Sequence, residues 1–89
     1  MSDKETIIKY IGKRCRELRR KSGMTVQESA DKAGISLRTL EAYELGEQEM
    51  PTSVAINLAG IYRTTLTKLT NYRFALKDLE IELHRHENE

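Results

Sequence analysis

Apolar side chains recur along the first quarter of the chain at the spacing of an α-helix. The intervals between them are four, four and three residues, and the four positions are Ile7, Ile11, Cys15 and Leu18. This spacing places them on one face of a helix that we expect from about residue 4 to residue 22. Gly23 follows where a left-handed residue commonly ends a helix. Because Cys15 lies within the apolar face, we interpret it as a small core residue rather than a reactive thiol.

The next two segments have the signals of short helices joined by a tight turn. Thr25 and Glu28 are spaced as a capping box, in which each side chain accepts a hydrogen bond from the other residue's backbone N–H. This predicts a helix over residues 26–33. The Ala-Gly-Ile-Ser sequence at 33–36 then provides a flexible turn and a good N-cap for a helix over 36–45. Two short helices in this arrangement give the geometry of a helix-turn-helix.

Two further helices are predicted after Pro51, and no β-type alternation of useful length is present. The apolar face of the first comprises Val54, Ala55, Leu58, Ala59 and Tyr62. Thr65 is placed to cap the second, which contains Leu66 and Leu69. The sequence therefore predicts an all-α fold.

The pattern changes after residue 71, where the apolar residues form a narrow stripe of the kind found in self-associating helices. The intervals are four, three and four residues, and the positions are Tyr72, Leu76, Leu79 and Leu83. Only two heptads are present, which is too few for a stable isolated coiled coil. The segment is expected to be either a dimerisation helix or a helix that packs on the bundle, and the pattern leaves both open. We therefore divide the chain into a helix-turn-helix domain at 1–71 and a C-terminal helix with a frayed end at 72–89.

Composition indicates one small domain. The chain has 89 residues, of which 38% are hydrophobic and 33% charged, so it can bury a modest core. No apolar run is long enough to span a membrane, and no secretory signal is expected near the start. The single cysteine fits a reducing cytoplasm. The net charge of +1 does not itself indicate a nucleic-acid partner, but residues 1–40 hold ten basic and five acidic residues, which permits a polyanion to bind one face.

The motifs between about residues 8 and 71 resemble those of the Cro/phage-repressor-type (XRE) helix-turn-helix domains. The shared features are an arginine-rich first helix, Gly-Met-Thr at 23–25, Ala-x-x-Ala-Gly-Ile-Ser at 30–36, Tyr-Glu-x-Gly at 43–46 and Pro51. The resemblance implies a five-helix lambda-repressor-like bundle plus a short C-terminal helix. It also implies a transcriptional regulator that binds double-stranded DNA, usually as a homodimer on a two-fold operator.

The resemblance further implies roles for individual residues. The positions that match base-facing sites of the third helix are Leu37, Arg38 and Ala42, with Glu41 beside them. The positions expected to contact the DNA backbone are Arg19, Thr25, Gln27, Lys32 and Thr39. An ion pair is expected between Arg19 and Glu44. Arg38 is suited to bidentate contact with guanine, worth roughly 1–3 kcal/mol of discrimination.

Three departures from the family pattern are present, of which the first two weaken the case for DNA binding and the third concerns the fold. Val26 occupies a position where the family often has a glutamine that binds the backbone. Glu47 and Glu49 follow the third helix where the family tends to have amides or cations, and carboxylates there repel phosphates. Arg63 stands where the family usually has glycine, and a left-handed arginine there costs on the order of 1 kcal/mol.

These departures keep a second function open. The same bundle serves as a protein–protein interaction module of the antitoxin or anti-repressor type, with weak or no DNA binding, if the acidic loop and exposed Leu37 and Leu45 contact a protein. An enzyme is not expected, because His84 and His86 are spaced to face different sides of a helix and no metal cluster or phosphate loop is present in the sequence. We expect no catalytic residues, metal, cofactor, small-molecule substrate or membrane partner.

Overall fold

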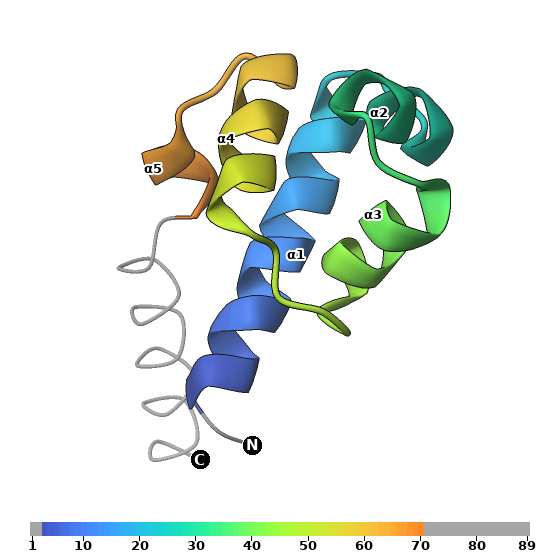
Figure 1. Ribbon diagram of the computed structural model, residues 1–89. Helices are drawn as coiled ribbons and strands as arrows, with labels where there is room; N and C mark the ends of the chain where they lie inside the picture. The colour runs from blue at the N-terminus through green and yellow to red at the C-terminus, as the bar shows by residue number, and fades with distance from the viewer. Residues whose placement is uncertain (1–2, 71–89) are drawn as a thin grey trace, which may run out of the picture.

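The computed structural model describes residues 3–70, which form five α-helices (Figure 1). Their bounds are α1 Asp3–Lys21, α2 Val26–Ala33, α3 Leu37–Leu45, α4 Thr52–Ile61 and α5 Leu66–Leu69. No strand occurs within residues 3–70. The predicted all-α class is confirmed, and the predicted helix bounds agree with the observed ones to within about two residues. Tyr72, Leu76, Leu79 and Leu83 lie outside the described residues.

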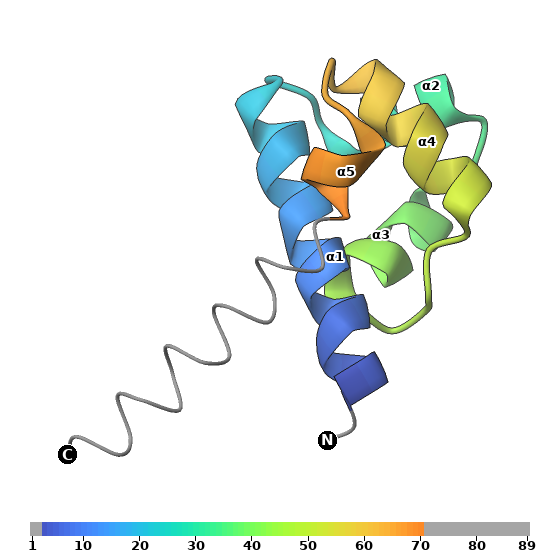
Figure 2. The same cartoon turned by 90° about the vertical axis from the view of Figure 1, so that its left-hand side faces the viewer.

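The long helix α1 is the axis of the bundle. In Figure 1, α2 and α3 lie on one side of it and α4 and α5 on the other, and Figure 2 shows α5 lying across the middle of α1. The contact between α1 and α5 includes a hydrogen bond from Arg14 Nε to the backbone oxygen of Lys68, at 3.4 Å. Each of the short helices α2–α5 packs against other helices. They depend on these contacts, because isolated helices of this length are marginally stable in water.

The turns between helices are built from local hydrogen bonds. Thr25 Oγ1 accepts from Glu28 N at 3.1 Å and Glu28 Oε1 accepts from Thr25 N at 3.2 Å, which completes the predicted capping box. Ser36 Oγ accepts from Thr39 N at 3.0 Å and caps α3. Gly34, between the two helices, has φ +69°, a conformation that glycine adopts without steric cost. These contacts fix the angle at which α3 leaves α2.

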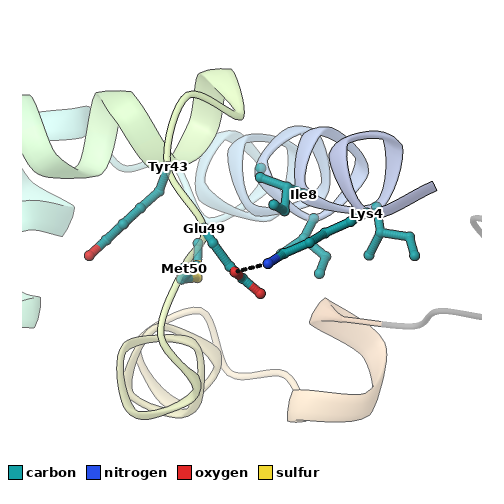
Figure 3. Close-up of a pocket in the computed structure, with 8 residues that line it drawn as sticks. Lys4, Ile8, Tyr43, Glu49 and Met50 are labelled. Carbon is teal, nitrogen blue, oxygen red and sulfur yellow. Dashed lines mark ion pairs between the residues drawn. The ribbon is translucent and has the colours of Figure 1, made fainter. Parts of the chain in front are cut away.

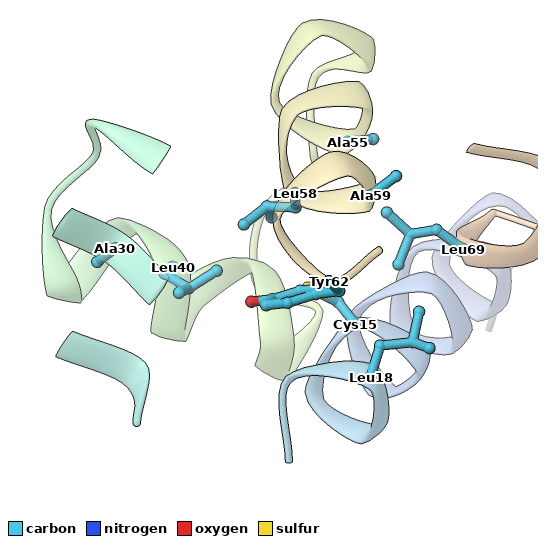
Figure 4. Packing of buried hydrophobic residues seen from close by; sticks show 9 residues of the cluster. All are labelled: Cys15, Leu18, Ala30, Leu40, Ala55, Leu58, Ala59, Tyr62 and Leu69. Atoms are coloured by element: carbon cyan, nitrogen blue, oxygen red, sulfur yellow. The ribbon is translucent and has the colours of Figure 1, made fainter. Parts of the chain in front are cut away.

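The hydrophobic core lies where all five helices meet (Figure 4). Its buried members are Cys15, Leu18, Ala30, Leu40, Ala55, Leu58, Ala59, Tyr62 and Leu69. Tyr62 brings a hydroxyl into this core and shares a 2.7 Å hydrogen bond with the fully buried Ser29 Oγ. The buried polar groups of this pair therefore satisfy each other.

Gly12 allows α1 and α3 to approach closely. A Cβ atom at this position would lie 2.8 Å from the backbone oxygen of Glu44 and would also collide with the backbone oxygen of Tyr43. Backbone atoms of a helix cannot move away at low cost. The absence of a side chain at Gly12 therefore sets the distance between the first helix and α3.

Two expectations need qualification. Only Cys15 and Leu18 of the predicted apolar stripe are buried, whereas Ile7 and Ile11 are half-buried beyond the end of the main core. Arg63 has φ +55° and is the only non-glycine residue with positive φ in the described range. The chain thus keeps the left-handed turn before α5 despite the missing glycine, and accepts its steric cost.

Candidate nucleic-acid interface

The outward face of α3 carries the residues predicted to contact bases. Leu37, Arg38 and Glu41 are exposed and Ala42 is half-buried, because Leu40, Tyr43 and Glu44 turn the opposite face of the helix into the protein. Arg38 forms no ion pair or hydrogen bond with any described residue. Its guanidinium is therefore available to a ligand.

Arg19 and Glu44 join α1 to α3 through a buried bidentate ion pair. Arg19 Nε donates to Glu44 Oε2 at 2.8 Å and Arg19 NH2 donates to Glu44 Oε1 at 3.1 Å. The remaining nitrogen of the guanidinium, NH1, donates to the backbone oxygen of Met24 at 2.9 Å. The hydrogen bond to Glu44 raises the pKa of Arg19 above its usual value, so the guanidinium stays charged.

This geometry gives Arg19 a structural role. The residue is 7% exposed, and all three of its nitrogens already donate to protein oxygens. These bonds use three of the five N–H groups of the guanidinium, so the observed role of Arg19 is the ion pair with Glu44. Its contact with the DNA backbone stays a prediction.

Arg16 and Arg20 are the more exposed cations beside α3. They line a surface hollow of about 310 Å³ together with residues of all three neighbouring helices: Arg19, Val26, Glu41, Glu44 and Leu45. Arg16 Nε lies 3.5 Å from Glu44 Oε1, and its side chain is 35% exposed. Arg20 is exposed. Two guanidinium groups therefore adjoin the outward face of α3.

Arg16 and Arg20 were not among the predicted site residues, although their spacing in the sequence carried a signal. Lys9, Lys13, Arg16 and Arg20 are separated by four, three and four residues, so they form one basic stripe on α1. The spacing could not show which neighbour this stripe faces. The ion pair between Arg19 and Glu44 supplies that information, because it fixes the rotation of α1 against α3.

The start of α2 offers fewer free groups than the sequence suggested. The Gln27 side chain donates to Asp31 Oδ1 at 2.8 Å, and the Thr25 hydroxyl already accepts from Glu28 N. Hydrogen bonds from Thr25 hold the pKa of Glu28 below its usual value, so this carboxylate stays ionised near the helix start. Lys32 is exposed on the same helix. The Thr39 hydroxyl lies 2.7 Å from Ser36 Oγ at the start of α3.

The acidic loop after α3 is partly neutralised. Glu49 Oε2 lies 3.6 Å from Lys4 Nζ across the loop, with both side chains largely exposed. Such a pair contributes little to stability, but it places a cation beside one of the two carboxylates that would repel a phosphate. Glu47 has no ion pair among the residues that the structure describes.

Three further properties bear on other kinds of site. No group of three or more histidine, cysteine, aspartate or glutamate residues suited to a metal ion occurs within residues 3–70. Over the same range, every helix is too short or too polar to cross a bilayer. Burial raises the pKa of the Cys15 thiol to about 12, so the described cysteine is a protonated core residue at neutral pH.

Most of the described chain matches a known family of domains. Residues 11–70 match the family described as helix-turn-helix domain. The chain belongs to the helix-turn-helix domain family. The finer resemblance to the XRE group stays a prediction.

Similar proteins carry related descriptions. A protein of Pyrococcus furiosus described as "Putative HTH-type transcriptional regulatory protein" is 38% identical over 61 residues, which cover 68% of this chain and 19% of that protein. One of Thermococcus kodakarensis with the same description is 39% identical over 61 residues, with the same coverage of 68% and 19%. The chain thus spans about a fifth of the length of these relatives.

A solved structure supports the fold. The crystal structure of the clp gene regulator ClgR from Corynebacterium glutamicum superposes with a TM-score of 0.74 over 89% of this chain and 87% of that one. The sequences are 20% identical, so this likeness concerns the fold alone.

Proposed function

We propose that this helix-turn-helix domain is a sequence-specific DNA-binding transcriptional regulator that places α3 in the major groove. The observation that carries the proposal is the position of Arg16 and Arg20, which share a hollow with Glu41 and Leu45 of α3. A helix that enters the groove brings the flanking helix close to the phosphates, where cations release counterions and supply affinity. The descriptions of the relatives as transcriptional regulatory proteins support the same function.

Base reading is assigned to the outward face of α3. Arg38 is exposed and its side chain pairs with no residue in 3–70, so we propose that it donates two hydrogen bonds to guanine O6 and N7. We further propose that Leu37 and Ala42 contact thymine methyl groups and that Glu41 accepts a hydrogen bond from cytosine N4. The proposed contacts with the DNA backbone remain Arg19, Thr25, Gln27, Lys32 and Thr39. The interaction-module alternative is not favoured by the relatives, although Leu37 and Leu45 are 37% and 53% exposed.

We also propose that the regulator acts as a homodimer in the cytoplasm. A two-fold dimer with one α3 per half-site requires half-sites about 34–36 Å apart, which is one turn of B-DNA. Sedimentation of the full chain with and without a two-half-site duplex tests the stoichiometry. Binding of one copy per duplex would contradict the dimer but not the use of α3. No enzymatic activity is part of the proposal.

The experiment measures binding of fluorescent duplexes by anisotropy at several salt concentrations. Replacing Arg16 and Arg20 with alanine should weaken binding to all sequences and reduce the slope of log affinity against log salt by about 2, roughly one for each lost phosphate contact. Arg14→Ala is the matched control, because Arg14 lies on the same helix but contacts Glu17 and the Lys68 backbone. It should leave the slope within about 0.5 of the parent value.

The base-reading residue is tested separately. Arg38→Ala should relax the preference at one base pair by roughly 1–3 kcal/mol and leave the other positions unchanged. The parent chain is measured from low salt upward against a mixed-sequence duplex pool. A parent chain that shows no salt-sensitive duplex binding even at low ionic strength contradicts the proposal and favours the interaction module.

A further inference from the structure

An open apolar groove of about 330 Å³ lies at the end of the bundle away from the turn between α2 and α3 (Figure 3). Its lining comes from the first half of α1, from α3 and from the loop after α3: Lys4, Ile7, Ile8, Ile11, Gly12, Tyr43, Glu49 and Met50. The volume is many times the roughly 30 Å³ that one water molecule occupies in the liquid. The groove is therefore large enough for side chains of another segment.

The groove continues the hydrophobic core beyond the helices that cover it. Ile7 and Ile11 extend the stripe whose other members, Cys15 and Leu18, are buried. Ile7, Ile8 and Ile11 are each half-buried, so a contiguous aliphatic surface meets water. Covering such a surface is favourable in proportion to the apolar area removed from water. The ion pair between Lys4 and Glu49 lies at the mouth of the groove (Figure 3), as at the rim of a docking site.

We propose that residues 72–83 of the same chain dock in this groove as a helix antiparallel to α1. The described chain stops at Thr70, directly after α5, and α5 is bonded to the middle of α1 through Arg14 and the Lys68 backbone. The next segment therefore starts beside α1. At a rise of 1.5 Å per residue, the distance along α1 from Arg14 to Lys4 is about 15 Å, and a helix from Tyr72 to Leu83 is about 16 Å long.

The chemistry of the segment fits the groove. Its apolar stripe repeats at four, three and four residues, which suits packing along a single helix: Tyr72, Leu76, Leu79 and Leu83. The later half of the segment also contains Glu80 and Glu82. In the antiparallel direction these carboxylates approach the first turns of α1, where Lys4 and Lys9 are exposed.

Docking within one chain is favoured over docking between two copies by proximity. Only Asn71 separates Thr70 from Tyr72, and so short a tether gives an effective concentration in the millimolar range. The sequence left two interpretations of the four stripe residues open, a dimer seam and a helix that packs on the bundle. The groove provides a surface on which such a helix can pack. The inference is independent of the proposed DNA binding.

Cysteine cross-linking in the full chain tests the inference. Ile8→Cys is combined in turn with Leu76→Cys, Leu79→Cys and Ile81→Cys, and the protein is oxidised at low concentration. Docking predicts a disulfide within one chain for Leu76 or Leu79, seen as a faster monomer band on a non-reducing gel. Ile81 is the matched control, because it lies on the opposite side of a helix from the stripe and should not link. The native Cys15 is buried and adds little background.

The possible results separate the alternatives. Links between chains only, with dimer bands at every dilution, would assign the stripe to a dimer seam and overturn the proposal. Failure of both stripe positions to link in a protein with parental helical circular dichroism would overturn it as well. If Ile8→Cys impairs folding, Ile7→Cys takes its place in the same series. Duplex binding by the unlinked variants is a separate readout, so a protein that fails to bind DNA does not affect the cross-linking result.

Discussion

Replacing Glu44 with leucine should destabilise the protein by about 3–5 kcal/mol, because it leaves the Arg19 guanidinium buried without a counter-charge. Arg19 and Glu44 are 7% and 5% exposed, and two charge-assisted hydrogen bonds of 2.8 and 3.1 Å join them. A domain of this size typically has a folding free energy of about 5–10 kcal/mol. The loss is thus a large part of the total.

The structure predicts that the two partners of this ion pair are not equivalent. Arg19→Met leaves Glu44 with Arg16, whose Nε lies 3.5 Å from Glu44 Oε1. The carboxylate therefore keeps a cation, and we expect a smaller loss of about 1–3 kcal/mol. The double variant Arg19→Met with Glu44→Leu removes both buried charges, and its stability should fall within about 1 kcal/mol of the Arg19→Met single variant.

Urea unfolding followed by circular dichroism gives the four free energies of the cycle. If Glu44→Leu is unfolded in buffer, trimethylamine N-oxide shifts all four proteins into the measurable range. Equal losses for the two single variants would refute the role given to Arg16. A double variant that loses the sum of the single losses would show that the two charges are not coupled.

Three further predictions concern the helix contact, the strained turn and the buried thiol. Gly12→Ala should cost about 1–3 kcal/mol in urea unfolding, because its Cβ meets the backbone of α3, whereas Gly60→Ala, with open space around it, should not be destabilising. Arg63→Gly should raise the thermal midpoint, because it relieves about 1 kcal/mol of left-handed strain, which exceeds by roughly 0.5 kcal/mol the entropic cost of a more flexible unfolded chain. Arg63→Ala, which keeps a Cβ at φ +55°, should not raise the midpoint. Cys15 should react with a thiol reagent at pH 8 only after denaturant is added. Burial raises the pKa of the Cys15 thiol from 9.0 to about 12, so the thiol ionises at lower pH in the unfolded chain than in the folded one. The contribution of the buried thiol to stability is therefore complete below pH 9 and is lost as pH rises towards 12. A Cys15→Ala variant should lose less stability between these pH values.

Local signals predicted most of the fold. The capping box at Thr25, the N-cap at Ser36 and the left-handed Gly34 all act through contacts within a few residues, and such contacts can be inferred from spacing alone. The partly uncovered stripe at Ile7 and Ile11 was not predictable in the same way. Periodicity shows which face of a helix is apolar, but not how far along the helix its neighbours extend.

The candidate site depends on relations between helices, and here the sequence was less informative. Nothing in the spacing of α1 indicates that Arg16 and Arg20 share a hollow with α3, or that Arg19 is only 7% exposed. The resemblance to a known family identified the partners Arg19 and Glu44, but the number of bonds that Arg19 makes emerged only from the structure.

The distribution of charge around α3 resolves the apparent conflict between a DNA-binding fold and an acidic loop. Lys9 packs against Gly46 at the end of α3, since a Cβ on that glycine would lie 2.6 Å from Lys9 Cγ. Lys4 pairs with Glu49 in the same region. The basic stripe of α1 therefore reaches both the hollow beside α3 and the loop after it.

Screening in physiological salt limits each exposed charge to a range of about 8 Å. Glu47 and Glu49 lie at the C-terminal end of α3, with Lys4 and Lys9 beside that end. Arg38, in the first turn, and Arg20, in the hollow with Glu41, have no carboxylate bound to them among the described residues. We therefore expect the affinity for phosphates to arise at the first half of α3 and along α1, away from the acidic loop. Neutralising Glu47 and Glu49 should then strengthen duplex binding less than removing Arg16 and Arg20 weakens it.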